Sequence, residues 1–327
     1  NKIEVLNLDM DFLHEGYPKL KFKTKKPSYP VIKKNKLKKY SLINKIHKIL
    51  SSPNIVTKEF VANQYDHEVQ GSSIIKPLQG VGKVFGNTTA IKPLYDDNKT
   101  ISLSQSAFPQ YSEADPYKMA ACSINTAVKN LVVMGANFKK IAILDNFCWC
   151  SSDEEGRLYE LRKAAEACYD YAVHYNTPFI SGKDSMYNDF KGFNQKNNPI
   201  KISIPPTLLI SSIGIVDKIN HLTKITPEKN DVIYVLGETH NELDKSQYEN
   251  FFRVKKTNIP KVNATKSLDL YKRFEKANKK NLFTSALGVD LGGIGITLIK
   301  MSIGSNLGLN INIPKKNKLD INPGIFK

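Results

Sequence analysis

Residues 182–185 read Gly-Lys-Asp-Ser and follow the short apolar run of residues 178–181, Pro-Phe-Ile-Ser. A glycine lets the backbone approach a ligand closely, and a lysine ammonium and a serine hydroxyl can both bind phosphate. The motif lacks the first glycine and the spacing of a Walker loop, and the same residue types are common in turns. Taken alone, these residues leave a phosphate site and an ordinary turn open, with the turn favoured.

Asp145 and Asn146 end a second apolar run, Ile-Ala-Ile-Leu at residues 141–144. The carboxyl ends of strands in open α/β sheets commonly face ligands, and a carboxylate there can hold Mg²⁺ or a ribose hydroxyl. An aspartate that caps the following turn would have the same sequence signature. The residues themselves do not separate these two interpretations.

Two further segments are weaker candidates for a site. The glycine-rich residues 287–296 could approach a pyrophosphate, but close packing of the following helix requires the same small residues, and we favour packing. His67 could act as an acid or base, although a loop histidine without an identified partner is more often a hydrogen-bonding residue. We find no Ser/His/Asp arrangement, no H-E-x-x-H motif and no C-x-x-C pair with histidines.

The spacing of apolar residues and caps predicts the elements that position these residues. A long helix is expected over residues 116–134, with Asp115 as N-cap, Pro116 at the first position and Gly135 at its end. Strands are expected within residues 2–13, 73–86, 89–105, 140–146, 178–181 and 231–239, with glycine-rich or Asp-Asn turns inside 73–105. Further helices are expected at residues 40–52 and near the C-terminus. The buried stripe of a second long helix is expected at Leu158, Leu161, Ala165, Cys168 and Ala172.

Composition limits the class of protein. The chain has 327 residues, of which 41% are apolar, and no apolar run long enough to cross a bilayer, so we expect a cytoplasmic protein of two domains with reduced cysteines. The net charge of +17 is concentrated in a basic connector, since residues 16–58 contain no acidic residue. Because no base-reading motif accompanies this charge, we do not expect nucleic acid to be the partner.

Eight motifs in order give the chain a resemblance to a known family. These are "LDMDFLHEGYP", "QYDHEVQG", "SEADPYKMAACSINTAVKNLVVMGA", "ILDNFCWC", "AAEACYDYAVHYNTPFISGKDSMYNDFKG", "KISIPPTLLISSIGIV", "YVLGETHNELDKSQY" and "TSALGVDLGGIGITLIKMSIGSNLGL". In this order they resemble the second half of phosphoribosylformylglycinamidine synthase. The resemblance covers nearly the whole chain except the basic connector and the lysine-rich inserts.

The resemblance implies an α/β fold with mixed sheets, in which an N-type domain of the aminoimidazole ribonucleotide synthetase superfamily is followed by a C-type domain. Residues 1–54 would hold the end strand of a preceding domain, the basic connector and a helix. Residues 55–216 would form the N-type domain, and residues 217–327 an incomplete C-type domain. The first half of the synthetase, which in the family holds the catalytic histidines, is missing here and would be the partner against which the N-type domain packs.

The family phosphorylates the formamide oxygen of formylglycinamide ribonucleotide with ATP, with Mg²⁺ as the metal, and ammonia from a glutaminase domain or subunit then displaces the phosphate. The resemblance therefore implies a C–N bond-forming ligase of purine biosynthesis. Because this chain lacks the half with the catalytic histidines, we expect it to be inactive alone. The alternative is a non-catalytic structural or regulatory nucleotide-binding module of the same enzyme.

Residue by residue, the resemblance implies ATP contacts at Asp145 and Gly182 and a substrate contact at Ser185. Lys183 stands where smaller members carry a metal-binding asparagine, and is expected to contact the ATP phosphate directly.

At a second, non-catalytic nucleotide site, long members use a glutamate and an asparagine on the first long helix to bind a metal. Here these positions are Thr126 and Asn130, so only Asn130 is left as a metal ligand, and Mg²⁺ at this second site is expected to be weakly bound or missing. The glycine-rich turn also departs from the family, since its carboxylate, Asp290, has moved by one residue.

Overall fold

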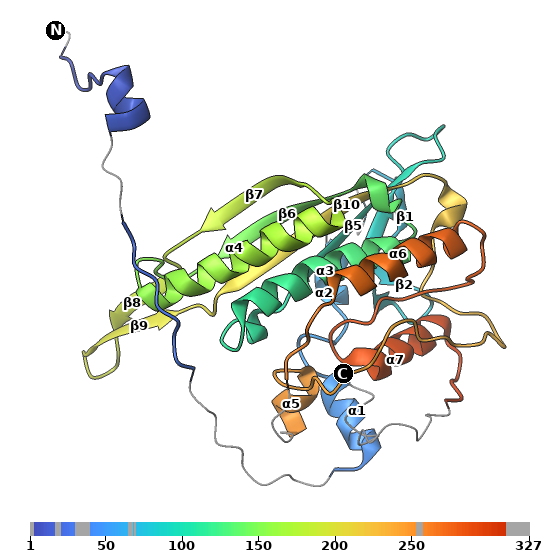
Figure 1. The fold of residues 1–327 in the computed structure, drawn as a ribbon. Helices are drawn as coiled ribbons and strands as arrows, with labels where there is room; N and C mark the ends of the chain where they lie inside the picture. The colour runs from blue at the N-terminus through green and yellow to red at the C-terminus, as the bar shows by residue number, and fades with distance from the viewer. Residues whose placement is uncertain are drawn as a thin grey trace.

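The computed structural model describes residues 3–16, 21–29, 40–64, 68, 70–252 and 258–311. His67, part of the basic connector and the last sixteen residues of the chain lie outside these ranges. The described part confirms the predicted mixed α/β fold, in which helices cover one face of a central sheet (Figure 1). No described helix is both long enough and apolar enough to cross a membrane.

The central sheet has six strands in the order β1-β4-β5-β10-β6-β7. Their bounds are β1 (Ser73–Ile75), β4 (Thr88–Ile91), β5 (Thr100–Ala107), β10 (Thr207–Val216), β6 (Ile141–Cys148) and β7 (Phe179–Ser185). All neighbours pair antiparallel except β6 and β7, which are parallel. The other strands of the described residues form two short hairpins, β2 (Leu78–Gln79) with β3 (Val84–Phe85) and β8 (Asp189–Phe193) with β9 (Pro199–Ser203).

Helix α3 (Pro116–Met134) forms as predicted, because its caps are local. The side chain of Asp115 accepts a hydrogen bond from the backbone N–H of Lys118 at 3.0 Å, and Pro116 occupies the first position. Gly135 ends the helix in the left-handed conformation, with φ of 107°. The helix packs its small residues against β5 and β10, where the Ser212 hydroxyl donates to the carbonyl of Ala127.

Helix α4 (Glu155–Tyr175) lies beside α3, and α6 (Ala264–Asn278) packs on both (Figure 1). The predicted stripe of α4 is partly wrong: Cys168 is buried, but Ala165 is exposed. The buried face instead contains Ala164, Ala167, Cys168, Tyr171 and Tyr175. The stripe is rotated because the α4 tyrosines fill the space against α3 and α6.

Other helices in the described residues are α1 (Leu42–Leu50), α2 (Glu59–Ala62), α5 (Gln247–Phe252) and α7 (Gly293–Ser305), and short 3₁₀ turns lie at Pro109–Tyr111, Phe138–Lys140 and Ile219–His221. Helices α1, α5 and α7 share a second, smaller core, which includes Ile49, Tyr248 and Ile296. The predicted helix at residues 40–52 and the helix after the glycine-rich loop are thus confirmed.

Two predicted strands are absent from the described residues. Residues 231–236 are irregular, and their apolar side chains are exposed, with Val232 at 73% and Tyr234 at 77%. Residues 3–9 are likewise irregular, and a π-helical turn (Phe12–Gly16) follows them. A strand needs a hydrogen-bonding neighbour, and among the described residues neither segment has one.

The turn after α3 gives a test of the packing between the end of this helix and the segment around His221. A Cβ atom on Gly135 would lie 2.0 Å from the carbonyl oxygen of His221, and the backbone conformation disfavours any L side chain. Gly135→Ala should therefore lower the free energy of unfolding by about 2 kcal/mol.

Chemical denaturation of Gly308→Ala provides the matched control, because nothing lies within 4 Å of a Cβ atom at Gly308. We expect this control to unfold like the wild type. Equal stability of the two variants would contradict the described packing at Gly135.

Candidate functional site

The parallel pair β6–β7 holds the predicted site residues at one edge of the sheet. A parallel connection requires a crossover, which α4 supplies between the two strands. The register places Asp145 opposite Gly182, Asn146 opposite Lys183, and Cys148 opposite Ser185. Residues 182–185 are therefore part of strand β7, and the interpretation of this motif as a turn is wrong: pairing with β6 keeps its backbone extended.

Asp145 and Gly182 lie together on the helix-bearing side of the sheet. Neighbouring residues of β6 on this side, Ile143 and Phe147, are buried. A Cβ atom at position 182 would lie 2.0 Å from Oδ1 of Asp145. Only glycine therefore leaves room for the carboxylate in this position.

The Asp145 carboxylate is in an environment that disfavours its negative charge. Burial raises its pKa, the nearby charge of Asp184 raises it further, and backbone N–H groups including that of Lys183 offset part of this effect. No ion pair to Asp145 is found among the described residues. A carboxylate in this condition is suited to binding a ligand that brings positive charge.

Lys183 and Ser185 lie on the opposite, open side of the sheet, because side chains alternate along a strand. The Lys183 ammonium donates to the Ser185 hydroxyl at 2.5 Å. On the same side, the Cys148 thiol lies 3.4 Å from Oδ1 of Asn146. The structure thus separates the predicted site residues into two pairs, Asp145 with Gly182 and Lys183 with Ser185.

The end of β7 is held by residues that the sequence did not identify. The backbone N–H of Trp149 donates to the carbonyl of Ser185 at 2.7 Å, and the Asn188 side-chain amide donates to the same oxygen at 2.7 Å. Trp149 is fully buried and is the one tryptophan in the chain. One sequence feature could have pointed to Trp149: it is the single tryptophan, it lies between two cysteines, and it follows closely after Asp145 and Asn146.

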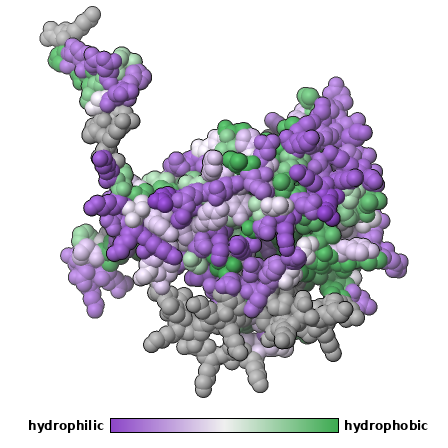
Figure 2. All heavy atoms as spheres, in the orientation of Figure 1, coloured by the Kyte–Doolittle hydropathy of each residue, from purple (hydrophilic) through white to green (hydrophobic). Residues whose placement is uncertain are grey.

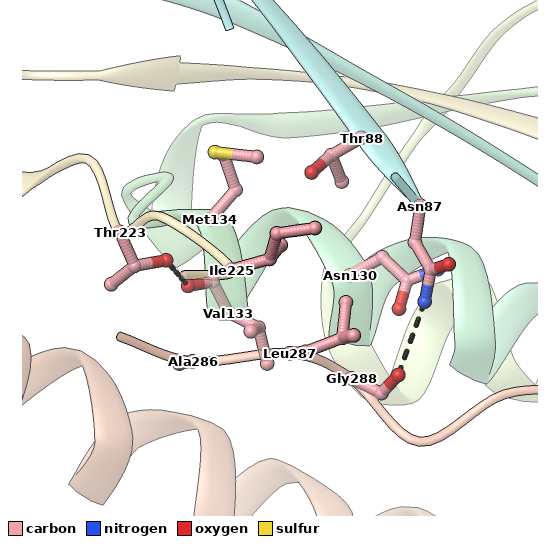
Figure 3. A pocket seen from close by; sticks show the side chains of 10 residues that line it. All are labelled: Asn87, Thr88, Asn130, Val133, Met134, Thr223, Ile225, Ala286, Leu287 and Gly288. Carbon is pink, nitrogen blue, oxygen red and sulfur yellow. Dashed lines mark hydrogen bonds between the residues drawn. The ribbon is translucent and has the colours of Figure 1, made fainter. Parts of the chain in front are cut away.

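Asn130 lies elsewhere, on α3, and faces a cavity of about 10 Å³ (Figure 3). Its side chain is 2% exposed, and neither its amide oxygen nor its amide nitrogen has a hydrogen-bond partner. Nearby, the side chain of Asn87 donates to the carbonyl of Gly288 at 3.1 Å. A cavity of this size holds about one water molecule.

The residues around Asn130 do not fit a divalent metal. None of the residues that line the cavity carries a carboxylate, and the described part of the chain holds no cluster of three or more potential ligands among His, Cys, Asp and Glu. Lys129 brings a positive charge nearby, because its ammonium donates to the carbonyl of Val289. Mg²⁺ prefers carboxylate oxygens and several waters, so Asn130 is a poor metal ligand here.

The glycine-rich loop before α7 serves packing, as favoured from the sequence. Gly292 has φ of 90°, and a Cβ atom there would lie 2.4 Å from the side chain of Ile296. The Asp290 carboxylate accepts from the backbone N–H of Leu291 at 2.8 Å.

Comparison with known proteins identifies relatives across most of the chain. Residues 86–209 match the family described as AIR synthase related protein, N-terminal domain. The phosphoribosylformylglycinamidine synthase subunit PurL of Thermococcus sibiricus is 29% identical over 315 residues, or 96% of this chain and 41% of that protein. The corresponding subunit of Picrophilus torridus is 30% identical over 288 residues, or 87% and 37% of the two chains.

Among solved structures, that of T. maritima PurL complexed with ATP matches with a TM-score of 0.45 and 16% identity, over 80% of this chain and 34% of that chain. The chain spans about two fifths of the length of the curated relatives it matches. The similarity over nearly the whole chain confirms the resemblance, predicted from the ordered motifs, to phosphoribosylformylglycinamidine synthase and its AIR synthase related domains.

Proposed function

We propose that the chain is the second half of an ATP-dependent phosphoribosylformylglycinamidine synthase. The reaction converts formylglycinamide ribonucleotide to the amidine, with ammonia delivered from glutamine by a glutaminase partner. Similarity to the synthase subunit supports the reaction class, and the Asp145–Gly182 pair is the observation that supports a place for ATP in this chain. In this proposal residues 55–216 are the N-type domain and residues 217–327 part of a C-type domain, in a cytoplasmic enzyme.

Asp145 would bind the nucleotide from the helix-bearing side of the sheet. Gly182 leaves room for the carboxylate, and Asp184 adds a second carboxylate close by. One or two carboxylates together with substrate phosphates are the usual ligands of Mg²⁺, so these two aspartates fit the metal of a nucleotide. When bound, Mg²⁺ would neutralise phosphate charge.

Lys183 would bind the γ-phosphate of the same nucleotide on the open side, where Ser185 would bind formylglycinamide ribonucleotide. Strand β7 is the edge strand of the sheet, so the phosphate chain can pass around this edge from Asp145 to Lys183. The Ser185 hydroxyl can donate to a substrate oxygen, because it already accepts a bond from Lys183. The Lys183 ammonium can neutralise charge on the phosphate without a metal. ATP phosphorylates the formamide oxygen, and ammonia then displaces that phosphate, so the protein's role is to position the groups and balance charge.

The open side of the sheet is the surface that we assign to the first half of the synthetase. Apolar side chains of β5, β10 and β6 lie side by side there, including Ile213 opposite Leu103, which is 43% exposed. The side that carries α3 and α4 is predominantly hydrophilic by contrast (Figure 2). An exposed apolar patch of this kind is typical of a protein interface.

The cavity at Asn130 weighs against the alternative of a purely structural nucleotide site. Its volume of about 10 Å³ is far too small for a nucleotide. The proposed ATP site at β6–β7 does not depend on it.

One prediction from the proposed function concerns activity. Purified alone, the chain should turn formylglycinamide ribonucleotide over with ATP and ammonia at least about 1000-fold more slowly than when it is mixed with the first half, because half of the positioned groups are absent. Phosphate release at saturating ammonia measures this. Full turnover by the isolated chain would refute the claim that it is half of a site.

The second prediction concerns ATP. Gly182→Ala should weaken binding of a non-hydrolysable ATP analogue to the mixed halves by at least about tenfold, or 1.4 kcal/mol, since the new methyl group displaces the Asp145 carboxylate. Calorimetric titration gives the dissociation constant, and Gly308→Ala is the matched control. Unchanged affinity in Gly182→Ala would remove Asp145 and Gly182 from the nucleotide site.

The third prediction concerns pH. Because the folded-state pKa of Asp145 is raised, its ionisation costs stability, which falls as pH rises from the unfolded pKa of about 3.9 through the folded value. Asp145→Asn should therefore unfold at higher denaturant concentration than wild type at pH 7.5, and this gain should shrink toward pH 4.

Asp217→Asn is a control for which we expect the opposite change in stability. A hydrogen bond from Lys140 lowers the pKa of Asp217, so this carboxylate contributes stability above the unfolded pKa. Its asparagine variant should be less stable than wild type at pH 7.5. If both variants shifted in the same direction, the described environment of Asp145 would be wrong.

A further inference from the structure

Residues 21–29, the described part of the basic connector, lie across the N-terminal end of α4 (Figure 1). We call this segment the strap. The backbone N–H of Lys25 donates to the carbonyl of Glu155 at 3.1 Å, and Pro27 lies 3.4 Å from the position of a Cβ atom on Gly156. The strap therefore follows the surface of α4 closely, although most of its side chains are exposed.

Charge favours this placement of the strap. Residues 21–29 carry four lysines and no acidic residue, whereas residues 153–155, at the start of α4, read Asp-Glu-Glu. Negative charge also suits the N-terminus of a helix, so the acidic run is well placed there and attracts the basic strap. This attraction gives the basic connector a role within the chain.

The buried carboxylate of Glu160 anchors the strap. Glu160 is 1% exposed and accepts two hydrogen bonds, from the Tyr29 hydroxyl at 2.9 Å and from the Arg157 guanidinium at 3.0 Å. A carboxylate this deeply buried needs such partners, because an unpaired charge would be costly. Burial and the neighbouring charge of Glu160 raise the pKa of Tyr29, so its hydroxyl remains a donor.

A continuous chain of hydrogen bonds leads from this anchor to the site. The indole N–H of Trp149 donates to the Arg157 carbonyl at 3.0 Å, and the backbone N–H of Trp149 donates to the Ser185 carbonyl. Asn188 closes the turn, because its backbone N–H donates to the carbonyl of Trp149 at 2.9 Å. The end of β7 and the strap are thus joined through a single buried tryptophan.

We propose that the strap is a positioning element: Tyr29, held by Glu160, fixes the N-terminal turn of α4 and through Trp149 sets the position of Ser185. Tyr29 and Glu160 are positioning residues, since neither touches the proposed substrate site directly. The proposal rests on the proposed function only for its kinetic consequence. The coupling between the strap and Trp149 is a property of this chain itself.

The test uses Trp149 as a reporter. Because the chain contains one tryptophan, its indole N–H gives one signal in a ¹⁵N-correlated spectrum, and hydrogen exchange of this group measures how often the turn opens. Tyr29→Phe removes one hydrogen bond to a charged group and should speed this exchange by about tenfold. Lys25→Pro, which removes the backbone bond to Glu155 and leaves Glu160 unchanged, should speed it as well.

Tyr95→Phe is the matched control. The Tyr95 hydroxyl donates to the carbonyl of Gln70 at 3.1 Å beyond strand β4, near the opposite edge of the sheet, so its loss should leave the Trp149 signal unchanged. Exchange within twofold of wild type in both Tyr29→Phe and Lys25→Pro would overturn the proposal. Equal acceleration in Tyr95→Phe would also overturn it, because the effect would then be a general loss of stability.

Steady-state kinetics of the mixed halves distinguish a failure of this proposal from a failure of the proposed function. In the mixed halves, Tyr29→Phe should raise KM for formylglycinamide ribonucleotide by about tenfold and leave KM for ATP unchanged, because Ser185 and Asp145 lie on opposite sides of the sheet. If Tyr29→Phe speeds indole exchange but the mixed halves have no synthase activity, the proposed function is rejected and the proposed coupling between the strap and Trp149 still holds. Faster exchange with both KM values unchanged would reject the positioning role.

Discussion

The parallel pairing of β6 with β7 is the constraint on which the candidate site depends. It places Asp145 opposite Gly182 and Lys183 opposite Asn146, and the alternation of side chains then separates the carboxylate from the lysine by the thickness of the sheet. A shift of one residue would move each side chain to the other face. The long α4 crossover and the hydrogen bonds of Trp149 to the end of β7 both maintain this register.

The two faces of the sheet differ in how far other elements cover them. Helices α3 and α4 bury one face in the main hydrophobic core, with Ile143 and Ile210 fully buried. The other face presents half-buried apolar residues and the Lys183–Ser185 pair. A substrate bound at Ser185 would therefore lie at the proposed interface with the first half of the synthetase, which gives a physical reason for dividing the site between two domains.

Features encoded locally could be predicted from the sequence. The caps of α3, Asp115 and Gly135, act within a few residues, and their positions were predicted correctly. The strand at residues 231–236 was predicted wrongly, because a strand depends on distant neighbours that its own sequence does not specify. The bond between Tyr29 and Glu160 joins positions 131 residues apart, and neither residue type signals the other. Likewise, the ends of two apolar runs marked Asp145 and Gly182 as candidates, but their assignment to ATP came only through the resemblance. The register was needed to show which side chains share a face.

The central claim is that the open face of this sheet docks the first half of a synthetase and so completes one site. Equilibrium sedimentation of the chain mixed with that first half measures it most directly, with Leu103→Glu as the variant that places a charge in the middle of the open face. The account predicts a stable one-to-one complex for the wild-type chain and none for Leu103→Glu. Two independent species with the wild-type chain, or an unchanged complex with Leu103→Glu, would contradict it.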